Sequence, residues 1–267
     1  MKERRAGDHM EEMMMKEKQS EIKEPLICVP LTGSSPERIL AEAEKCREAK
    51  VAMVEWRLDC YDDCFCFPKM LAFLKKLREI LHEQQLLATF RTRKEGGNKA
   101  CETAQYIELY EHLIKSDLID LIDVELSMGE KVVDQLLTLA HENNRKVILS
   151  YHNFQQTPPP ATLLRYFDQM ASLNADLLKI AVMPQTEEDV IQLMLAAREA
   201  HQRYHKPLIA IAMGELGKIT RVCAEFLGSA VTFASIDHSS APGQIPISQM
   251  RRYLSFFHSI AAQLKEE

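Results

Sequence analysis

Short apolar runs alternate with longer amphipathic stretches along most of this chain, from about residue 25 onward. Each run is rich in Val, Ile and Leu, as expected for strands that are buried on both faces of a parallel sheet. The sequence therefore predicts eight strands, at residues 26–31, 51–58, 86–91, 121–126, 147–152, 176–184, 208–213 and 231–236.

The stretches between these runs place apolar residues three and four positions apart, which is typical of helices with one buried face. Leu71, Leu74, Leu77 and Leu81 show this spacing. The segment Ser35-Pro36-Glu37 has the residue types that favour a helix start: a serine cap, a proline and an acid. Helices are predicted over residues 37–49, 69–83, 101–116, 130–143, 160–173, 187–204, 218–227 and 247–264.

Eight strands that are each followed by a helix predict an α/β protein, a single-domain (β/α)8 TIM barrel over residues 25–267. An open doubly wound sheet is the alternative, but it tends to carry a G-x-G-x-x-G turn after its first strand. Here Thr32-Gly33-Ser34-Ser35 stands at that place. Residues 1–24 are charged and rich in methionine, and we expect an N-terminal extension that is either disordered or added in cloning.

The charge balance narrows the class of partner. A net charge of −6 and a pI near 5.9 argue against nucleic acid or an anionic membrane as a main partner. The net charge does not exclude an anionic small molecule as a substrate, because a local cationic pocket can exist on an acidic protein. The charged N-terminus is no secretory signal, and no segment approaches the roughly 20 apolar residues of a membrane span. With seven scattered cysteines, we expect a cytoplasmic protein with reduced thiols.

Three cysteines lie close together, at Cys60, Cys64 and Cys66, and suggest a metal site at first sight. No second Cys/His pair at ligand spacing accompanies them, and Phe65 and Phe67 lie among them. The chain also has no H-E-x-x-H motif. We therefore expect no metal, and the role of this cysteine cluster stays open.

One lysine, Lys179, stands in the middle of the apolar run 176–184. Burial disfavours an ammonium, so that the neutral amine, which is a nucleophile, becomes accessible. The run by itself fits a structural lysine better, either one that reaches solvent from the strand end or one held in an ion pair. The other strand ends have to decide between these interpretations.

In a (β/α)8 barrel the active site lies at the C-terminal ends of the strands. Glu55 and Arg57 share one face at the end of the second run, and Arg91 ends the third, ahead of a flexible Gly96-Gly97 pair. His152 ends the fifth run and is the side chain best suited to exchange a proton near neutral pH. The structural alternatives are an ion pair that caps the barrel core and a buried structural histidine.

The last two loops add groups that suit an anion. Ser240 and Gln244 offer hydroxyl and amide donors after the eighth run. Arg221 is placed near the start of the helix after the seventh run, where a carboxylate would also meet the helix N-terminus. Plain β–α loops are the alternative for both.

Together these residues favour imine catalysis on a ketone that bears an anionic group. Lys179 would form the imine, which acidifies the adjacent C–H bond, and His152 would remove that proton. The cationic neighbours of Lys179 are expected to favour its neutral amine.

Seven separated motifs resemble type I 3-dehydroquinate dehydratase, the imine-forming dehydratase of the shikimate pathway. Each motif is weak alone, but all of them in this order are highly specific. They are Glu55-Trp56-Arg57-Leu58-Asp59, Thr89-Phe90-Arg91 with Lys94-Glu95-Gly96-Gly97, Asp123-Val124-Glu125-Leu126, Ser150-Tyr151-His152-Asn153-Phe154, Leu178-Lys179-Ile180-Ala181, Met213-Gly214 with Gly217 and Arg221, and Ser240-Ala241-Pro242-Gly243-Gln244.

The resemblance implies a (β/α)8 homodimer without metal or organic cofactor, which eliminates water from 3-dehydroquinate to give 3-dehydroshikimate. By position, Lys179 resembles the imine-forming lysine, His152 the general acid/base, and Glu95 the acid that orients it. The resemblance further implies that the substrate hydroxyls are held by Glu55, Arg57 and Arg91. It implies a clamp for the substrate carboxylate made by Arg221, Ser240 and Gln244. The apolar walls of the pocket would be Met213 and Phe233.

Two rival functions remain. A class I aldolase also places an imine lysine on a barrel strand, but aldolases with phosphorylated substrates need a glycine-rich phosphate site after the late strands. This chain has an arginine and a Ser/Gln loop there, which suit a carboxylate better. A non-catalytic ligand-binding barrel should lack Lys179 or His152, and both are present. Whether the pathway is biosynthetic or catabolic stays open.

Overall fold

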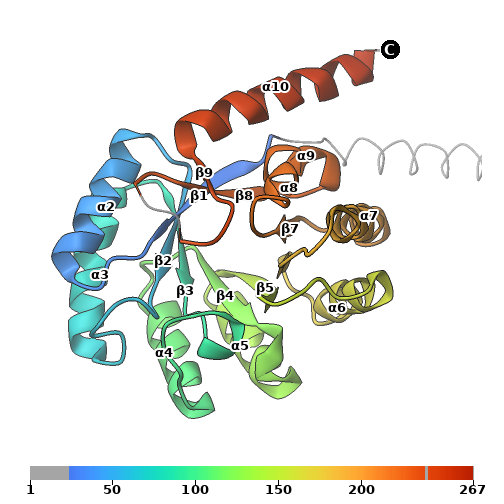
Figure 1. Ribbon diagram of the computed structural model, residues 1–267. Helices are drawn as coiled ribbons and strands as arrows, with labels where there is room; N and C mark the ends of the chain where they lie inside the picture. The colour runs from blue at the N-terminus through green and yellow to red at the C-terminus, as the bar shows by residue number, and fades with distance from the viewer. Residues whose placement is uncertain (1–23, 238–239, 267) are drawn as a thin grey trace, which may run out of the picture.

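Eight parallel strands curl into a barrel with helices packed around the outside (Figure 1). This computed structural model describes residues 24–237 and 240–266, so the prediction for residues 1–24 falls almost wholly outside the described residues. The (β/α)8 prediction is confirmed, and the doubly wound alternative is wrong. The strands are β1 Leu26–Leu31, β2 Met53–Arg57, β3 Gln85–Thr89, β4 Leu121–Glu125, β5 Lys146–Asn153, β6 Leu177–Val182, β7 Leu208–Ala212 and β8 Val231–Ser235, with a two-residue β9, Ile245–Pro246, added to the edge of β8.

The helices follow the predicted segments closely, with one exception. Residues 218–227 form two short helices that are separated at Cys223, instead of one. Two short 3-10 turns, η1 Arg93–Glu95 and η2 Leu126–Met128, were not predicted. The helices are α2 Pro36–Glu48, α3 Phe67–Leu81, α4 Thr103–Lys115, α5 Glu130–Glu142, α6 Pro160–Ser172, α7 Glu187–Tyr204, α8 Lys218–Val222, α9 Ala224–Leu227 and α10 Ile247–Glu266.

Strand alternation separates two cores. Outward-facing residues such as Val54 and Trp56 pack with the helices, while Met53 and similar residues fill the barrel interior. Along β4, the inward-facing positions change from Leu121 to Asp123 within two residues. The lower barrel is therefore an apolar core, and its upper layers carry the charged side chains.

The seam between β7 and β8 is closed differently from the other strand junctions, which are continuous parallel ladders. Backbone pairing across the seam, in the part of the chain described, is confined to an isolated bridge at Leu208. Above it, Ala210 N donates to Ser229 Oγ at 3.1 Å, and Ala212 N donates to Thr220 Oγ1 at 3.0 Å. Side-chain hydroxyls thus take the place of a neighbouring strand, and α8 occupies this part of the barrel mouth.

The cysteine cluster forms a packed turn between β2 and α3. Cys64 is buried, with its Sγ 3.6 Å from Lys99 Nζ, and Cys60 Sγ accepts a hydrogen bond from Asn98 Nδ2 at 3.1 Å. All seven cysteines are free thiols. Within residues 24–237 and 240–266, no three His, Cys, Asp or Glu side chains come together as ligands for a metal ion.

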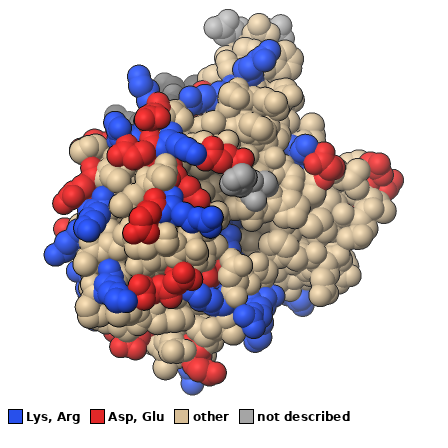
Figure 2. Space-filling model, turned by 60° about the vertical axis from the view of Figure 1, so that its left-hand side comes forward, with Lys and Arg blue, Asp and Glu red and all other residues tan. Residues whose placement is uncertain are grey.

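One part of the outer surface mixes charges of both signs. On the face drawn in Figure 2, Lys and Arg side chains lie among Asp and Glu side chains over that part, while a broad area beside it carries few charges. Of the helices described, none combines the length and the apolar character needed to cross a bilayer.

Candidate active site

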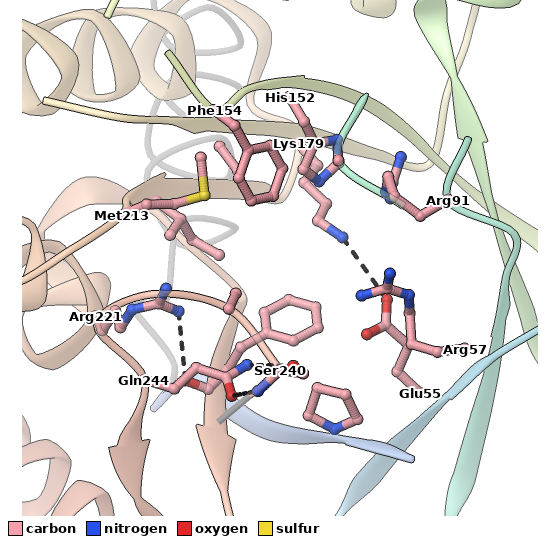
Figure 3. A pocket seen from close by; sticks show the side chains of 16 residues that line it. Glu55, Arg57, Arg91, His152, Phe154, Lys179, Met213, Arg221, Ser240 and Gln244 are labelled. Carbon is pink, nitrogen blue, oxygen red and sulfur yellow. Dashed lines mark hydrogen bonds and ion pairs between the residues drawn. The ribbon is translucent and has the colours of Figure 1, made fainter. Parts of the chain in front are cut away.

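A pocket of about 550 Å³, part of it open to solvent, lies at the C-terminal ends of the strands (Figure 3). Ten of the eleven residues predicted for the site line it, and Glu95 lies behind one of them, His152. The ten are Glu55, Arg57, Arg91, His152, Lys179, Met213, Arg221, Phe233, Ser240 and Gln244. Figure 3 shows them in two groups, with Lys179, His152 and two arginines on one side and Arg221, Ser240 and Gln244 on the other.

Lys179 points from β6 into the barrel mouth, where its side chain is 5% exposed. Its Nζ donates to Asp123 Oδ2 at 2.8 Å and lies 3.9 Å from Glu55 Oε1, above the ring of Phe233. The charges nearest to Nζ are therefore those of acids. This differs from the expectation that cationic neighbours favour the neutral amine.

Arg91 is surrounded by acids. Its Nη2 donates to Asp123 Oδ1 at 2.7 Å, and its Nη1 donates to Glu125 Oε1 and to Ser150 Oγ, both at 3.0 Å. Burial alone would raise the pKa of Asp123, but the charges of Arg91 and Lys179 outweigh it and hold that pKa well below its usual range. Arg91 thus borders the pocket with its charge already balanced inside the protein.

His152 and Glu95 form a buried pair. His152 Nδ1 and His152 N both lie 3.0 Å from Glu95 Oε2, and Ser127 Oγ donates to Glu95 Oε1 at 2.6 Å. Burial lowers the pKa of His152 well below its usual value, and the charges of Arg91 and Lys179 lower it further. An Nδ1–H that donates to Glu95 leaves Nε2 able to accept a proton.

Glu95 itself is shifted in the opposite direction. Burial, and then the charge of Glu125, raises the pKa of Glu95 to about 7. A carboxyl with this pKa and an imidazole with a lowered pKa both tend toward their neutral forms. The pair can therefore accommodate a proton near neutral pH.

Arg57 is fixed by a two-point ion pair. Its Nε and Nη2 donate to the two oxygens of Asp59, each at 2.8 Å. The fully buried Asp59 also accepts from the backbone N–H of Asn98 at 3.0 Å, which ties the loop after β3 to β2. Glu55 accepts a hydrogen bond from the Thr89 hydroxyl at 2.9 Å. Both side chains that were predicted at the end of β2 are therefore held rigidly.

Arg221 has a different environment. Its Nη2 donates to Pro242 O at 3.1 Å and its Nη1 to Phe233 O at 3.5 Å, while the buried Nε has no partner within residues 24–237 and 240–266. No carboxylate pairs with it among the residues described. Burial lowers the pKa of Arg221 to about 10. Arg221 is the fourth residue of the five-residue α8, so it lies near the end of this helix and not near its start, as was expected.

The loop before β9 closes this side of the pocket. Gln244 Nε2 donates to Ser240 Oγ at 2.9 Å, and Ser240 N donates to Gln244 Oε1 at 2.8 Å. Gly243 has a φ of +76° and lies so near Gly214 that a Cβ would come 2.2 Å from its carbonyl oxygen. The loop therefore packs directly on the end of β7, with its polar groups beside Arg221 (Figure 3).

Four residues of the site were not predicted to take part. Asp123 and Glu125 stand on alternate positions of β4, as Lys179 does on β6, so their parity was a usable signal. Phe154 lines the pocket and lies against Gly96, where a Cβ would come 2.3 Å from its ring. Ser127 lies in the 3-10 turn η2, and no pattern in the sequence marks it.

Comparisons with known proteins identify the family of this chain. The family model described as Type I 3-dehydroquinase matches residues 27–261. A 3-dehydroquinate dehydratase of Clostridium botulinum is 40% identical over 235 residues, which cover 88% of this chain and 92% of the relative. The crystal structure of type I 3-dehydroquinate dehydratase from Clostridium difficile with covalently modified comenic acid is 38% identical, with a TM-score of 0.86, over 88% of this chain and 93% of that one. The structure of the enzyme from Geobacillus kaustophilus is 39% identical, with a TM-score of 0.86, over 89% and 92% of the two chains.

Proposed function

The chain belongs to the type I 3-dehydroquinase family, and from this premise we propose that it dehydrates 3-dehydroquinate through an imine on Lys179, with His152 as general acid and base. Membership makes it a lyase, a dehydratase of the shikimate pathway. The observation that carries the mechanism is the position of Lys179: among the described residues that line the pocket it has the only primary amine of a side chain.

The first step joins substrate and enzyme. Lys179 Nζ, once deprotonated, adds to the ketone carbon, and the resulting carbinolamine loses water to give a protonated imine. The Clostridium difficile relative holds covalently modified comenic acid, which supports covalent chemistry in a pocket of this fold. No cofactor is proposed, because the imine itself accepts the electron pair of the next step.

The second step is the elimination. His152 Nε2 removes a proton from the carbon next to the imine carbon, and the electron pair moves into an enamine. The enamine expels the hydroxyl of the following carbon, which leaves as water with a proton from His152. Hydrolysis of the imine then frees the product and Lys179. The lowered pKa of His152 supports this role, because the base has to begin neutral.

The remaining polar residues are proposed to position the substrate. Arg221 offers a cation that pairs with no carboxylate of the described part of the chain, and Ser240 and Gln244 lie beside it, which suits the substrate carboxylate. On the opposite side of the pocket, the substrate hydroxyls would be held by Glu55, Arg57 and Arg91. The apolar walls would be Met213 and Phe233. A homodimer in the cytoplasm stays a prediction.

Trapping of the imine tests this mechanism. The protein is incubated with 3-dehydroquinate and borohydride, and the adduct is located by peptide mass mapping. We expect the adduct on Lys179, and expect Lys179→Arg to give neither adduct nor turnover. His152→Ala should still give the adduct, with turnover reduced by about 10²- to 10⁴-fold. An adduct on another lysine would contradict the Lys179 assignment, and wild-type turnover by His152→Ala would remove His152 from the mechanism.

A further inference from the structure

The carboxylate nearest to the Lys179 amine belongs to Asp123, a residue of β4 to which the mechanism above gives no role. Its Oδ2 lies 2.8 Å from Nζ, whereas Glu55 Oε1 lies at 3.9 Å. The Asp123 side chain is fully buried. It therefore faces the atom that becomes the imine nitrogen, in a place from which solvent is excluded.

We propose that Asp123 is the counter-ion of the protonated imine on Lys179 and keeps that imine protonated during the reaction. This inference rests on the proposed imine mechanism. A protonated imine accepts an electron pair far more readily than a neutral one, because its nitrogen carries the charge that the pair neutralises. A fixed negative charge beside the nitrogen thus favours the reactive form.

The nitrogen of Lys179 carries one positive charge both as the ammonium before imine formation and as the protonated imine after it. An ammonium and a ketone give a protonated imine and one water molecule, so one positive charge faces Asp123 before and after. The neutral amine and the carbinolamine occur only in between. A carboxylate that is fixed in advance can stabilise both charged states without rearrangement of the site.

The contacts of Asp123 suit a counter-ion better than a base. Its Oδ1 accepts from Arg91 Nη2 at 2.7 Å and from Ser150 Oγ at 2.6 Å, which leaves Oδ2 turned toward Lys179. These donors hold the carboxylate in place. The lowered pKa of Asp123 means that it binds a proton weakly, so the proton stays on the imine nitrogen.

Other charged and titratable groups also face this part of the barrel, and the experiment has to separate them from Asp123. They come from four strands, the segment after β3 and one short turn: Cys28 on β1, Glu55 and Arg57 on β2, Arg91 after β3, Glu95 in η1, Glu125 on β4 and His152 on β5. Among them, Glu125 offers a matched control. It is buried on the same strand two residues further on and also binds Arg91, but its contacts are with Arg91 and Thr92.

The test compares Asp123→Asn with Glu125→Gln in the full-length protein. Cyanoborohydride reduces a protonated imine much faster than a neutral one, so the pH above which trapping on Lys179 declines reports loss of the imine proton. We expect this limit to move to lower pH by about 1 to 3 pH units in Asp123→Asn. We also expect kcat to fall by about 10²- to 10³-fold. Glu125→Gln should keep the wild-type pH limit, whatever it does to kcat.

Three outcomes would overturn the inference. If Glu125→Gln moves the pH limit as far as Asp123→Asn does, the effect belongs to the Arg91 network and not to Asp123. If Asp123→Asn keeps both the wild-type limit and the wild-type kcat, Asp123 is not the counter-ion, although the imine mechanism stands. If wild-type protein gives no adduct at any pH, the proposed function itself fails, and the inference with it.

A measurement on wild-type protein keeps the inference testable if Asp123→Asn does not fold. The C=N stretch of the product-bound imine shifts in D₂O when the nitrogen carries a proton. We expect that isotope shift at neutral and mildly alkaline pH. A stretch that is the same in H₂O and D₂O would show a neutral imine and overturn the role of Asp123.

Discussion

Arg91 and Arg221 are buried on opposite sides of one pocket, and their charges are balanced in opposite ways. Arg91 ion-pairs with Asp123 and Glu125 within 3.0 Å. Arg221 donates to two backbone carbonyls, and its buried Nε has no partner among the residues that the structure describes. Burial lowers the pKa of Arg221 to about 10. One guanidinium completes a network inside the protein, while the other is suited to an anion from outside.

This difference separates two uses of a buried cation. Removal of one partner from a buried ion pair leaves an uncompensated charge, so a paired cation contributes to stability as long as its acids are present. A buried cation without a counter-charge weakens the fold, and an incoming carboxylate meets little competition from protein groups. The pocket thus has a side that is fixed by folding and a side that we propose is completed by substrate.

The largest effect that this comparison predicts is on stability, in Arg91→Met. The change leaves Asp123 and Glu125 buried with fewer partners, and we expect the free energy of unfolding to fall by about 3–5 kcal/mol. Urea denaturation of the variant and of wild type, with the slopes compared, measures this loss. Surface substitutions usually change the free energy of unfolding by less than about 1 kcal/mol. If Arg91→Met changes it by no more than that, the ion pairs of Arg91 do not stabilise this side of the pocket.

The matching change on the other side, Arg221→Met, should act on binding instead. Loss of a charge-assisted hydrogen bond of about 1.5–3 kcal/mol raises KM about 10- to 150-fold with kcat nearly unchanged, if the contact is made equally in ground and transition states. Removal of an unpaired buried cation should leave the free energy of unfolding unchanged or increased. Steady-state kinetics and the same urea titration check both. A loss of stability as large as that of Arg91→Met would erase the contrast.

The smallest predicted effect concerns the Glu95–His152 pair, whose members are shifted in opposite directions. Because the folded pKa of Glu95 is raised from 4.5 to about 7, its contribution to stability declines as pH rises through this range. Because the folded pKa of His152 lies well below 6.5, its contribution grows as pH rises toward 6.5. In wild type these two trends oppose each other between pH 4.5 and 6.5.

Single variants should expose each trend. Relative to wild type, Glu95→Gln leaves His152 alone, so Tm should rise more steeply with pH over that window. His152→Asn leaves Glu95 alone, so Tm should fall with rising pH relative to wild type. Thermal unfolding at several pH values measures both slopes. If the slope of Tm against pH changes in the same direction in both variants, relative to wild type, the pKa values of Glu95 and His152 are not shifted in opposite directions.

The sequence predicted the barrel well and its polar network poorly, for physical reasons. All eight strands were predicted because strands buried on both faces need continuous apolar runs, which stand out from amphipathic helices. The segment 218–227 was predicted as one helix because its two parts are too short for a periodicity to reveal the break at Cys223.

The site was predictable as far as it lies on strand ends. Strand parity put Glu55 and Arg57 on one face, and His152 was recognised by its place at a strand end. The role of Glu95 came from family resemblance, since it follows β3 in a short turn. Which acid faces Lys179 depends on the stagger between strands that are distant in sequence. Parity along β4 could mark Asp123 as inward-facing, but no single strand shows that Asp123 is the acid that meets Lys179.

The seam between β7 and β8 has a consequence for how the barrel can change over evolutionary time. Elsewhere the strands are joined by peptide groups, which no substitution other than proline removes. At the seam, the hydroxyls of Thr220 and Ser229 accept the backbone N–H groups of β7. Apart from the backbone bridge at Leu208, closure there depends on these two hydroxyl side chains. Single substitutions can therefore loosen this junction while the remaining ladders keep the barrel folded. Because Thr220 directly precedes Arg221, such a change at Thr220 would act beside the side of the pocket that we propose binds the substrate carboxylate.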